Sequence, residues 1–161
     1  MRTVLAAILI LAAGLTRAAA PVTQKEVDAT LAEVEKALSA LPGLKHIKPQ
    51  TRKPSSTKPA TRAYIILQMN RIFERAKPSF KFTPRKVRFD PKVLVAGAER
   101  SALEKLIAWG CVAKVGPLAT GPKSTIGLKE FGDAMGFFVA RISDLSHTPD
   151  PKYSPGMMGG G

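Results

Sequence analysis

The chain of 161 residues contains one cysteine, two histidines, one tryptophan and two tyrosines. A single cysteine excludes an intramolecular disulfide framework and a zinc site built from cysteines. Two histidines leave little for a metal centre built from imidazoles. The few Trp and Tyr side chains argue against an aromatic stacking platform for single-stranded nucleic acid. We therefore predict that the protein holds neither a metal ion nor another cofactor.

Catalytic motifs are also missing from the sequence. Gly116 and Gly121 have the spacing of a phosphate-binding loop, but Pro122 separates them from Lys123 and removes a backbone donor. The S-x-x-K pattern at 55–58 lies in a proline-rich stretch, and no K-T-G triplet accompanies it. No pair of carboxylates suggests acid–base chemistry. We predict that the protein is not an enzyme.

The N-terminus has the three-part form of a secretory signal peptide. Arg2 precedes an apolar run over 4–15, and small residues follow at 18–20. The apolar run is shorter than the roughly 20 residues that span a membrane, although an uncleaved N-terminal anchor is the alternative. We expect cleavage after Ala18 or after Ala20. Residues 1–20 are thus predicted to be removed, and the protein to reach the cell envelope, the periplasm or the cell surface.

Basic residues greatly outnumber acidic ones, with 25 Lys and Arg against 12 Asp and Glu and a net charge of +13. Most of the excess lies in residues 45–92, which hold fourteen basic and two acidic residues. Such a stretch attracts polyanions of any chemistry. Outside the cytoplasm these are wall polymers, lipid head groups or lipopolysaccharide. Nucleic acid is the main alternative partner, and the signal peptide argues against it.

Apolar residues spaced three and four apart predict helices over 22–41, 61–77, 98–109 and 128–142. The predicted fold class is all-α, a small bundle of about four helices joined by long Pro- and Gly-rich loops. A short extended piece is expected at 87–89. The predicted core consists of Ile65, Met69, Ile72, Phe73, Leu103, Leu106, Ile107, Phe131, Met135 and Phe138, and Cys111 is expected to be a small buried residue.

These features divide the mature chain into four parts. We predict an N-terminal amphipathic helix in 21–43, a basic Pro-rich linker in 44–59, a helical domain in 60–145 and a disordered Gly/Pro/Met tail in 146–161. The second and fourth helices align when Thr61 is laid on Gly127, which also matches Met69 with Met135. Any two amphipathic helices align in a similar way, so the repeat is a hypothesis.

Several segments carry a resemblance to a known repeat. Residues 101–112 read SALEKLIAWGCV, 126–131 read IGLKEF, and 60–65 read ATRAYI. These resemble the S-layer homology domain, the wall-anchoring module of bacterial surface proteins. Its repeat has a helix of the type A-I-E-K-L-x-x-x-G-I-I, a Gly-rich loop and a second helix that opens I-T-R-A-E-F. The chain resembles one whole repeat, from 89 to 141, preceded by the second half of another. Residues 23–27 are either a third copy of the opening or a simple capping box.

The resemblance implies a function and three site residues. In the family, the Thr-Arg part of the opening helps to bind an acidic wall glycan, which implies this role for Thr61 and Arg62. Glu130 matches the family's Glu, a position that suits helix capping as well as binding. The sequence departs from the pattern at Tyr64, which replaces the first Glu, and at Leu128, which replaces the second Arg. The W-A pair is not evident.

The expected function is non-covalent binding of an anionic wall polysaccharide or peptidoglycan, together with contacts to other surface-layer proteins. A nucleic-acid-binding protein and a purely structural envelope protein without glycan binding are the alternatives. Arg62 bears on this choice, because a cation in the first turn of a helix is electrostatically unfavourable. An anionic ligand would remove that conflict. Otherwise we expect the Arg62 side chain to point into water.

Overall fold

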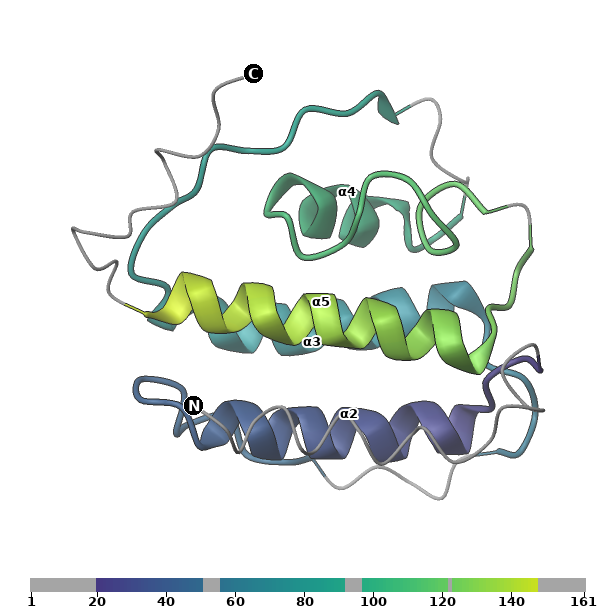
Figure 1. The fold of residues 1–161 in the computed structure, drawn as a ribbon, viewed down its shortest axis with the longest axis horizontal. Coiled ribbons are helices and arrows are strands. Elements are labelled where there is room, and N and C mark those ends of the chain that lie inside the picture. Colours follow the sequence, from purple (N-terminus) through teal and green to yellow (C-terminus); the bar gives the residue numbers. More distant parts are fainter. Residues whose placement is uncertain (1–19, 51–55, 92–96, 122, 148–161) are drawn as a thin grey trace.

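The computed structural model describes residues 20–50, 56–91, 97–121 and 123–147 (Figure 1). They form the helices α2 (Gln24–Ser39), α3 (Arg62–Ala76), α4 (Arg100–Ala108) and α5 (Leu128–Ser146), with a short 3₁₀ helix η2 (Lys77–Ser79). No β-strand occurs in these ranges, and residues 87–89 form no regular extended element. The predicted all-α class with four helices is confirmed. Residues 1–19 of the predicted signal peptide (1–20) lie outside the described residues.

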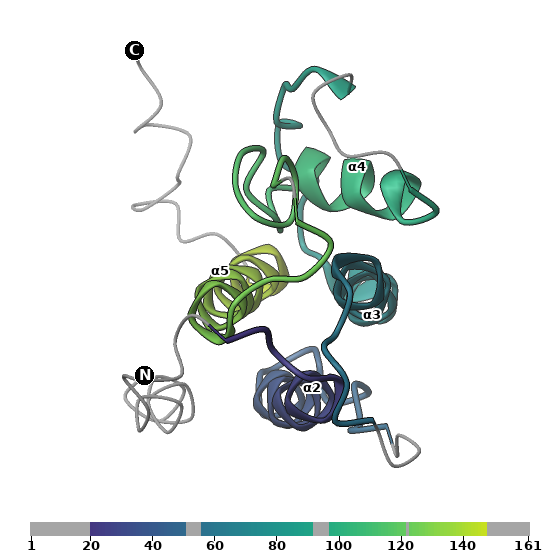
Figure 2. The ribbon, with the colours of Figure 1, turned by 90° about the vertical axis from the view of Figure 1, so that its right-hand side faces the viewer.

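Three helices form the bundle and the fourth lies on top of it. Figure 2 shows α2, α3 and α5 nearly end-on at the corners of a triangle. The helix α4 lies on the far side of α3 and α5 from α2, and both views agree on this arrangement. The ten predicted core residues are all at most 3% exposed, and Cys111 is fully buried. The apolar periodicity of the sequence therefore identified the packed faces correctly.

Helix starts follow local capping chemistry. Thr23 and Glu26 form the predicted capping box on α2, in which the Thr23 amide donates to the Glu26 carboxylate at 2.8 Å. On α3, the Thr61 hydroxyl accepts the amide of Tyr64 at 3.1 Å. On α5, Gly127 offers no side chain, but its amide donates to the Glu130 carboxylate at 2.8 Å. Each contact satisfies an amide that the first turn leaves without a helical partner.

The segments that lead into α2, α3 and α5 pair with one another in a closed cycle. Isolated antiparallel bridges join Pro21 to Gly127, Thr23 to Pro59 and Thr61 to Thr125. The first residue of each helix donates its amide to the segment before another helix. These bonds are Gln24 to the Lys58 carbonyl at 3.0 Å, Arg62 to Ser124 at 2.6 Å and Leu128 to Ala20 at 3.1 Å. We call residues 20–23, 58–61 and 124–127 the helix-opening ring.

The ring gives the internal repeat a geometric basis. Thr61 and Gly127, which the sequence alignment pairs, are the N-caps of α3 and α5, and Thr23 is the N-cap of α2. The three positions are equivalent in the bridge pattern. The opening of α2 therefore takes part in the same arrangement as the other two.

Two boundaries differ from the sequence prediction. The helix α5 continues to Ser146 instead of ending at 142, because Leu145 and Ser146 are buried and the Ser146 hydroxyl donates to the Ile142 carbonyl at 2.7 Å. The start of the predicted tail at 146 is therefore helical, and residues 148–161 lie outside the described residues. The predicted linker from 44 to 59 begins inside the core, since Leu44 and Ile47 are fully buried.

Candidate functional site

Thr61 is the N-cap residue of α3. Its hydroxyl oxygen accepts the Tyr64 amide, and its backbone takes part in the helix-opening ring. Tyr64 stands where the family pattern has Glu, and its hydroxyl donates instead to Asp28 of α2 at 2.6 Å. The first opening thus uses a tyrosine to join α3 to α2 in place of a second capping bond.

Arg62 is buried, with 8% of its surface exposed. Its Nη1 donates to the carbonyls of Gly121 at 2.9 Å and Lys123 at 2.8 Å. Its Nε lies 3.7 Å from Oε1 of Glu99, a carboxylate that is itself buried. The side chain therefore neither points into water nor waits for an external anion. The two carbonyls and the carboxylate offset the unfavourable field of the helix N-terminus.

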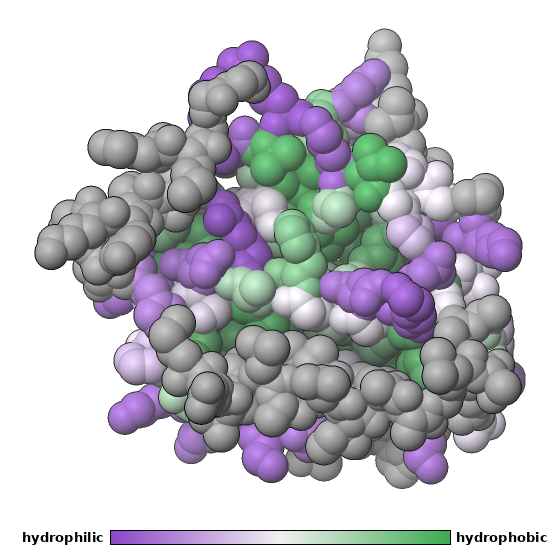
Figure 3. Space-filling model, in the orientation of Figure 1, coloured by the Kyte–Doolittle hydropathy of each residue, from purple (hydrophilic) through white to green (hydrophobic). Residues whose placement is uncertain are grey.

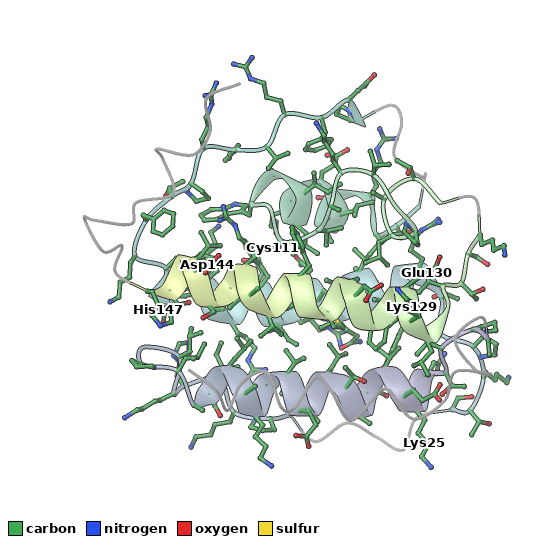
Figure 4. All side chains as sticks on the ribbon, in the orientation of Figure 1. Lys25, Cys111, Lys129, Glu130, Asp144 and His147 are labelled. Carbon is green, nitrogen blue, oxygen red and sulfur yellow. The ribbon has the colours of Figure 1, made fainter. Side chains whose placement is uncertain are left out.

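Glu130 is exposed near the start of α5. Its Oε2 caps the Gly127 amide, as described above. Figure 4 shows Glu130 and Lys129 together at one end of α5, with Asp144 and His147 at the other end. Lys129 donates to Asp133 at 2.8 Å, and this hydrogen bond, with the charges of Asp133 and Glu130, raises the pKa of Lys129. The N-terminal end of α5 thus carries an exposed capping carboxylate and an exposed lysine–aspartate pair.

A groove lies between α5 and the loop that follows α4. It has a volume of about 290 Å³. Its walls are apolar and include Val112, Val115, Leu118 and Phe137, and its polar side chains are Glu130 and Asp133. Val115 is 69% exposed and Phe137 is 51% exposed, which is high for large apolar side chains. Figure 3 shows apolar surface gathered in this region, between α5 and the chain above it.

Arg62 contacts the loop that forms one wall of this groove. The wall is a tight loop in which the Gly116 carbonyl accepts the amides of Ala119, Thr120 and Gly121 at 2.9–3.1 Å. Gly116 has φ of +134°, and a Cβ on Gly121 would come within 2.7 Å of the Pro117 carbonyl oxygen. The guanidinium of Arg62 then fixes the Gly121 carbonyl. Of the three residues predicted from the resemblance, Glu130 lines the groove, Arg62 holds its wall, and Thr61 caps the helix that carries Arg62.

Basic side chains gather on a second surface, which we call the basic strap and define as residues 80–91. Phe80, Phe82 and Phe89 pack against the core from this segment. The amide of Lys81 donates to the Leu145 carbonyl at 2.8 Å, and that of Val87 to Ala108 at 3.1 Å. Lys81, Arg85, Lys86 and Arg88 are exposed and form no ion pair with any described residue.

Other basic residues have intramolecular roles. Arg75 donates to the buried carboxylate of Glu35 at 2.6 Å, and Lys105 pairs with Glu74. Lys77 lies over the ring of Trp109, 5.7 Å from its centroid. The basic residues of 45–92 therefore have two roles. Some form intramolecular contacts that stabilise the fold, and others are exposed on the basic strap.

The lone cysteine and the metal-ligating residue types can be placed within the described part of the chain. Burial raises the pKa of Cys111 to about 12, so its thiol stays protonated at neutral pH. No group of three or more metal-ligating side chains occurs in the described ranges. None of the helices described is both long and apolar enough to cross a membrane.

Sequence reasoning missed the apolar half of the groove. Phe137 is next to the buried Phe138 but does not belong to the apolar face of the helix. The apolar spacing of the helix could therefore have identified Phe137 as an exposed aromatic residue. Val115 gives no such signal, because the sequence does not distinguish it from the nearby Cys111 and Val112, which are buried. Comparison with known proteins finds no match to any family model, to any curated protein or to any solved structure.

Proposed function

We propose that this chain is an exported, non-enzymatic envelope protein that binds an anionic cell-wall glycan non-covalently. The observation that carries the proposal is the basic strap, with four exposed cations that form no ion pair with any described residue. Cations without intramolecular partners lose no ion pair when an anionic polymer binds. The polymer's release of counterions adds a favourable entropy.

The strap is suited to a polymer because its backbone is held in place. Its three phenylalanines are anchored on the core, so the intervening basic side chains are displayed from a fixed chain. Two backbone hydrogen bonds tie the segment to the C-terminal part of α5 and to the end of α4. An ordered display costs less conformational entropy on binding than a free tail would. The four cations extend along the segment, a distribution that suits a repeating anionic chain.

The residues implied by the S-layer homology resemblance have supporting roles in this proposal. Thr61 and Arg62 hold the helix-opening ring and the loop that bounds the groove. Glu130 caps the Gly127 amide and lines the groove beside that loop. The cyclic pairing of three helix openings agrees with a protein built from repeats, which is what the resemblance suggests.

The test compares two polyanions at the same ionic strength. Sedimentation of the mature protein with purified cell walls that retain their anionic polymers is measured beside its binding to duplex DNA. We expect tighter binding to the walls at matched salt. Preference for DNA would favour a nucleic-acid-binding protein. Failure to bind either polymer would favour a purely structural envelope protein.

A further inference from the structure

We propose that the groove between α5 and the 112–118 loop binds a primary amine on an aliphatic stem, as presented by the peptide portion of a cell-wall polymer. This inference rests on the proposed function, because it names a second contact with the same wall. The strap would hold the anionic chain, and the groove would hold an amine-bearing peptide attached to it.

The shape and lining of the groove fit an aliphatic stem. Its volume of about 290 Å³ lies at the small end of the range for ligand pockets, which suits a side chain better than a large cofactor. Val115 and Phe137, which are 69% and 51% exposed, both line the groove. Burial of this surface against methylene groups would be favourable by roughly 25 cal/mol per Å².

The charge on the rim fits an ammonium group. Glu130 and Asp133 both line the groove, and Lys129 is the ammonium already paired with Asp133. Two carboxylates beside one cation leave an acidic excess, in a chain whose overall charge is +13. The hydrogen bond to Asp133 and the charges of Asp133 and Glu130 raise the pKa of Lys129, the direction expected for an ammonium beside carboxylates. A carboxylate or phosphate at the same place would be repelled.

The combination of an apolar floor and an acidic rim matches how lysine-like chains bind. Such chains lay their methylene groups along apolar surface and keep the ammonium at the edge, in water. The ring of Phe137 offers both an apolar face and a cation–π contact. A neutral sugar would use the carboxylates as acceptors but would not need the apolar wall formed by Val112, Val115 and Leu118.

The experiment measures binding of acetyl-Ala-Lys-Ala-amide to the mature protein by NMR titration. A matched peptide carries an acetyl group on the lysine side chain and so lacks the charge. We expect shifts at Val115, Phe137 and Glu130 with the amine peptide, and about tenfold weaker binding of the acetylated peptide. Equal binding of both peptides would overturn the inference, as would binding of neutral wall oligosaccharides at the groove in preference to the amine.

The variants separate the groove from the rest of the molecule. Glu130→Gln keeps a capping side chain on α5, and combined with Asp133→Asn it removes the acidic rim. We expect this double variant to lose about tenfold in peptide affinity. Asp144→Asn is the control, because Asp144 is an exposed carboxylate at the opposite end of the same helix. Equal loss in the control, or no loss in the double variant, would contradict the amine site.

Two outcomes distinguish failure of this inference from failure of the proposed function. If the protein sediments with walls but does not bind the amine peptide, the groove assignment is wrong and the strap proposal stands. If it binds the peptide but not walls, the proposed function is wrong. The groove then binds an amine, but the cell-wall polymer is not the source of that amine. Concentration-dependent dimerisation that Phe137→Ala abolishes would mean that a second copy fills the groove, which also overturns the inference.

Discussion

At the scale of single residues, Arg62 illustrates how a motif position can serve the fold. Its guanidinium joins α3 to Glu99 and to two carbonyls of the loop before α5. The sequence alone places this side chain in the first turn of a helix. It predicts that the guanidinium contacts either water or an anionic ligand. The partners are distant in sequence and belong to loops, so no local pattern could have identified them.

Removal of the Arg62 side chain should therefore destabilise the protein. Arg62→Ala would leave the Glu99 carboxylate buried without its cation, and a broken buried pair costs about 3–5 kcal/mol. We expect a clearly lower melting temperature by circular dichroism. Lys123→Ala is the control, because only the backbone carbonyl of Lys123 is used.

A double-mutant cycle isolates the Arg62–Glu99 pair. The free-energy cost of the combined Arg62→Ala and Glu99→Ala changes should be smaller than the sum of the single costs. A melting temperature of Arg62→Ala that is unchanged or raised would contradict the stabilising role of the pair.

Cys111 provides a residue-scale prediction with a defined pH dependence. Burial raises the pKa of Cys111 to about 12 in the folded protein, from 9.0 for a thiol in water, so the folded state favours the protonated form. The associated stability is fully present below pH 9.0 and is lost as the pH rises towards about 12. At pH 8 we expect very slow labelling by a thiol reagent in the folded protein and fast labelling in urea. Rapid labelling of the folded protein would show that Cys111 is accessible.

At the scale of elements, α5 places two adjacent phenylalanines in opposite environments. Phe138 is fully buried, whereas Phe137 is 51% exposed on the groove. We expect Phe138→Ala to lower the free energy of unfolding by about 3–5 kcal/mol. Phe137→Ala should lower it by less than about 1 kcal/mol. Urea titration of both variants measures the difference, and similar costs would mean that α5 is rotated relative to its described packing.

The sequence predicted elements better than the connections between them. Helix positions and the ten core residues followed from apolar spacing, since one face of each helix must be buried. The connections carry weaker patterns. Leu44 and Ile47 were assigned to a linker because prolines and basic residues surround them, yet both are fully buried. The groove could not be predicted, because it depends on how the 112–118 loop packs on α5.

At the scale of the whole molecule, the helix-opening ring ties the N-terminus of the predicted mature chain to α5. The Ala20 carbonyl accepts the Leu128 amide at 3.1 Å, and Val22 is buried. Cleavage after Ala18 keeps this bond, whereas cleavage after Ala20 removes the carbonyl. We therefore predict that intact-mass measurement of the exported protein finds Ala19 at the N-terminus. A chain that begins at Pro21 would contradict the role of the ring, and an intact Met1 would contradict processing.

We propose that the basic strap attaches the protein to an anionic wall polymer. The decisive measurement is the affinity for purified cell walls of the variant K81Q/R85Q/K86Q/R88Q. Its matched control, K25Q/K36Q/K114Q/K123Q, removes four exposed cations outside the strap. Exposed ion pairs contribute about 0.2–1 kcal/mol each, so loss of four should weaken binding about fourfold or more. We predict this loss for the strap variant and a much smaller one for the control. Equal losses would mean that net charge alone drives binding and would contradict the account.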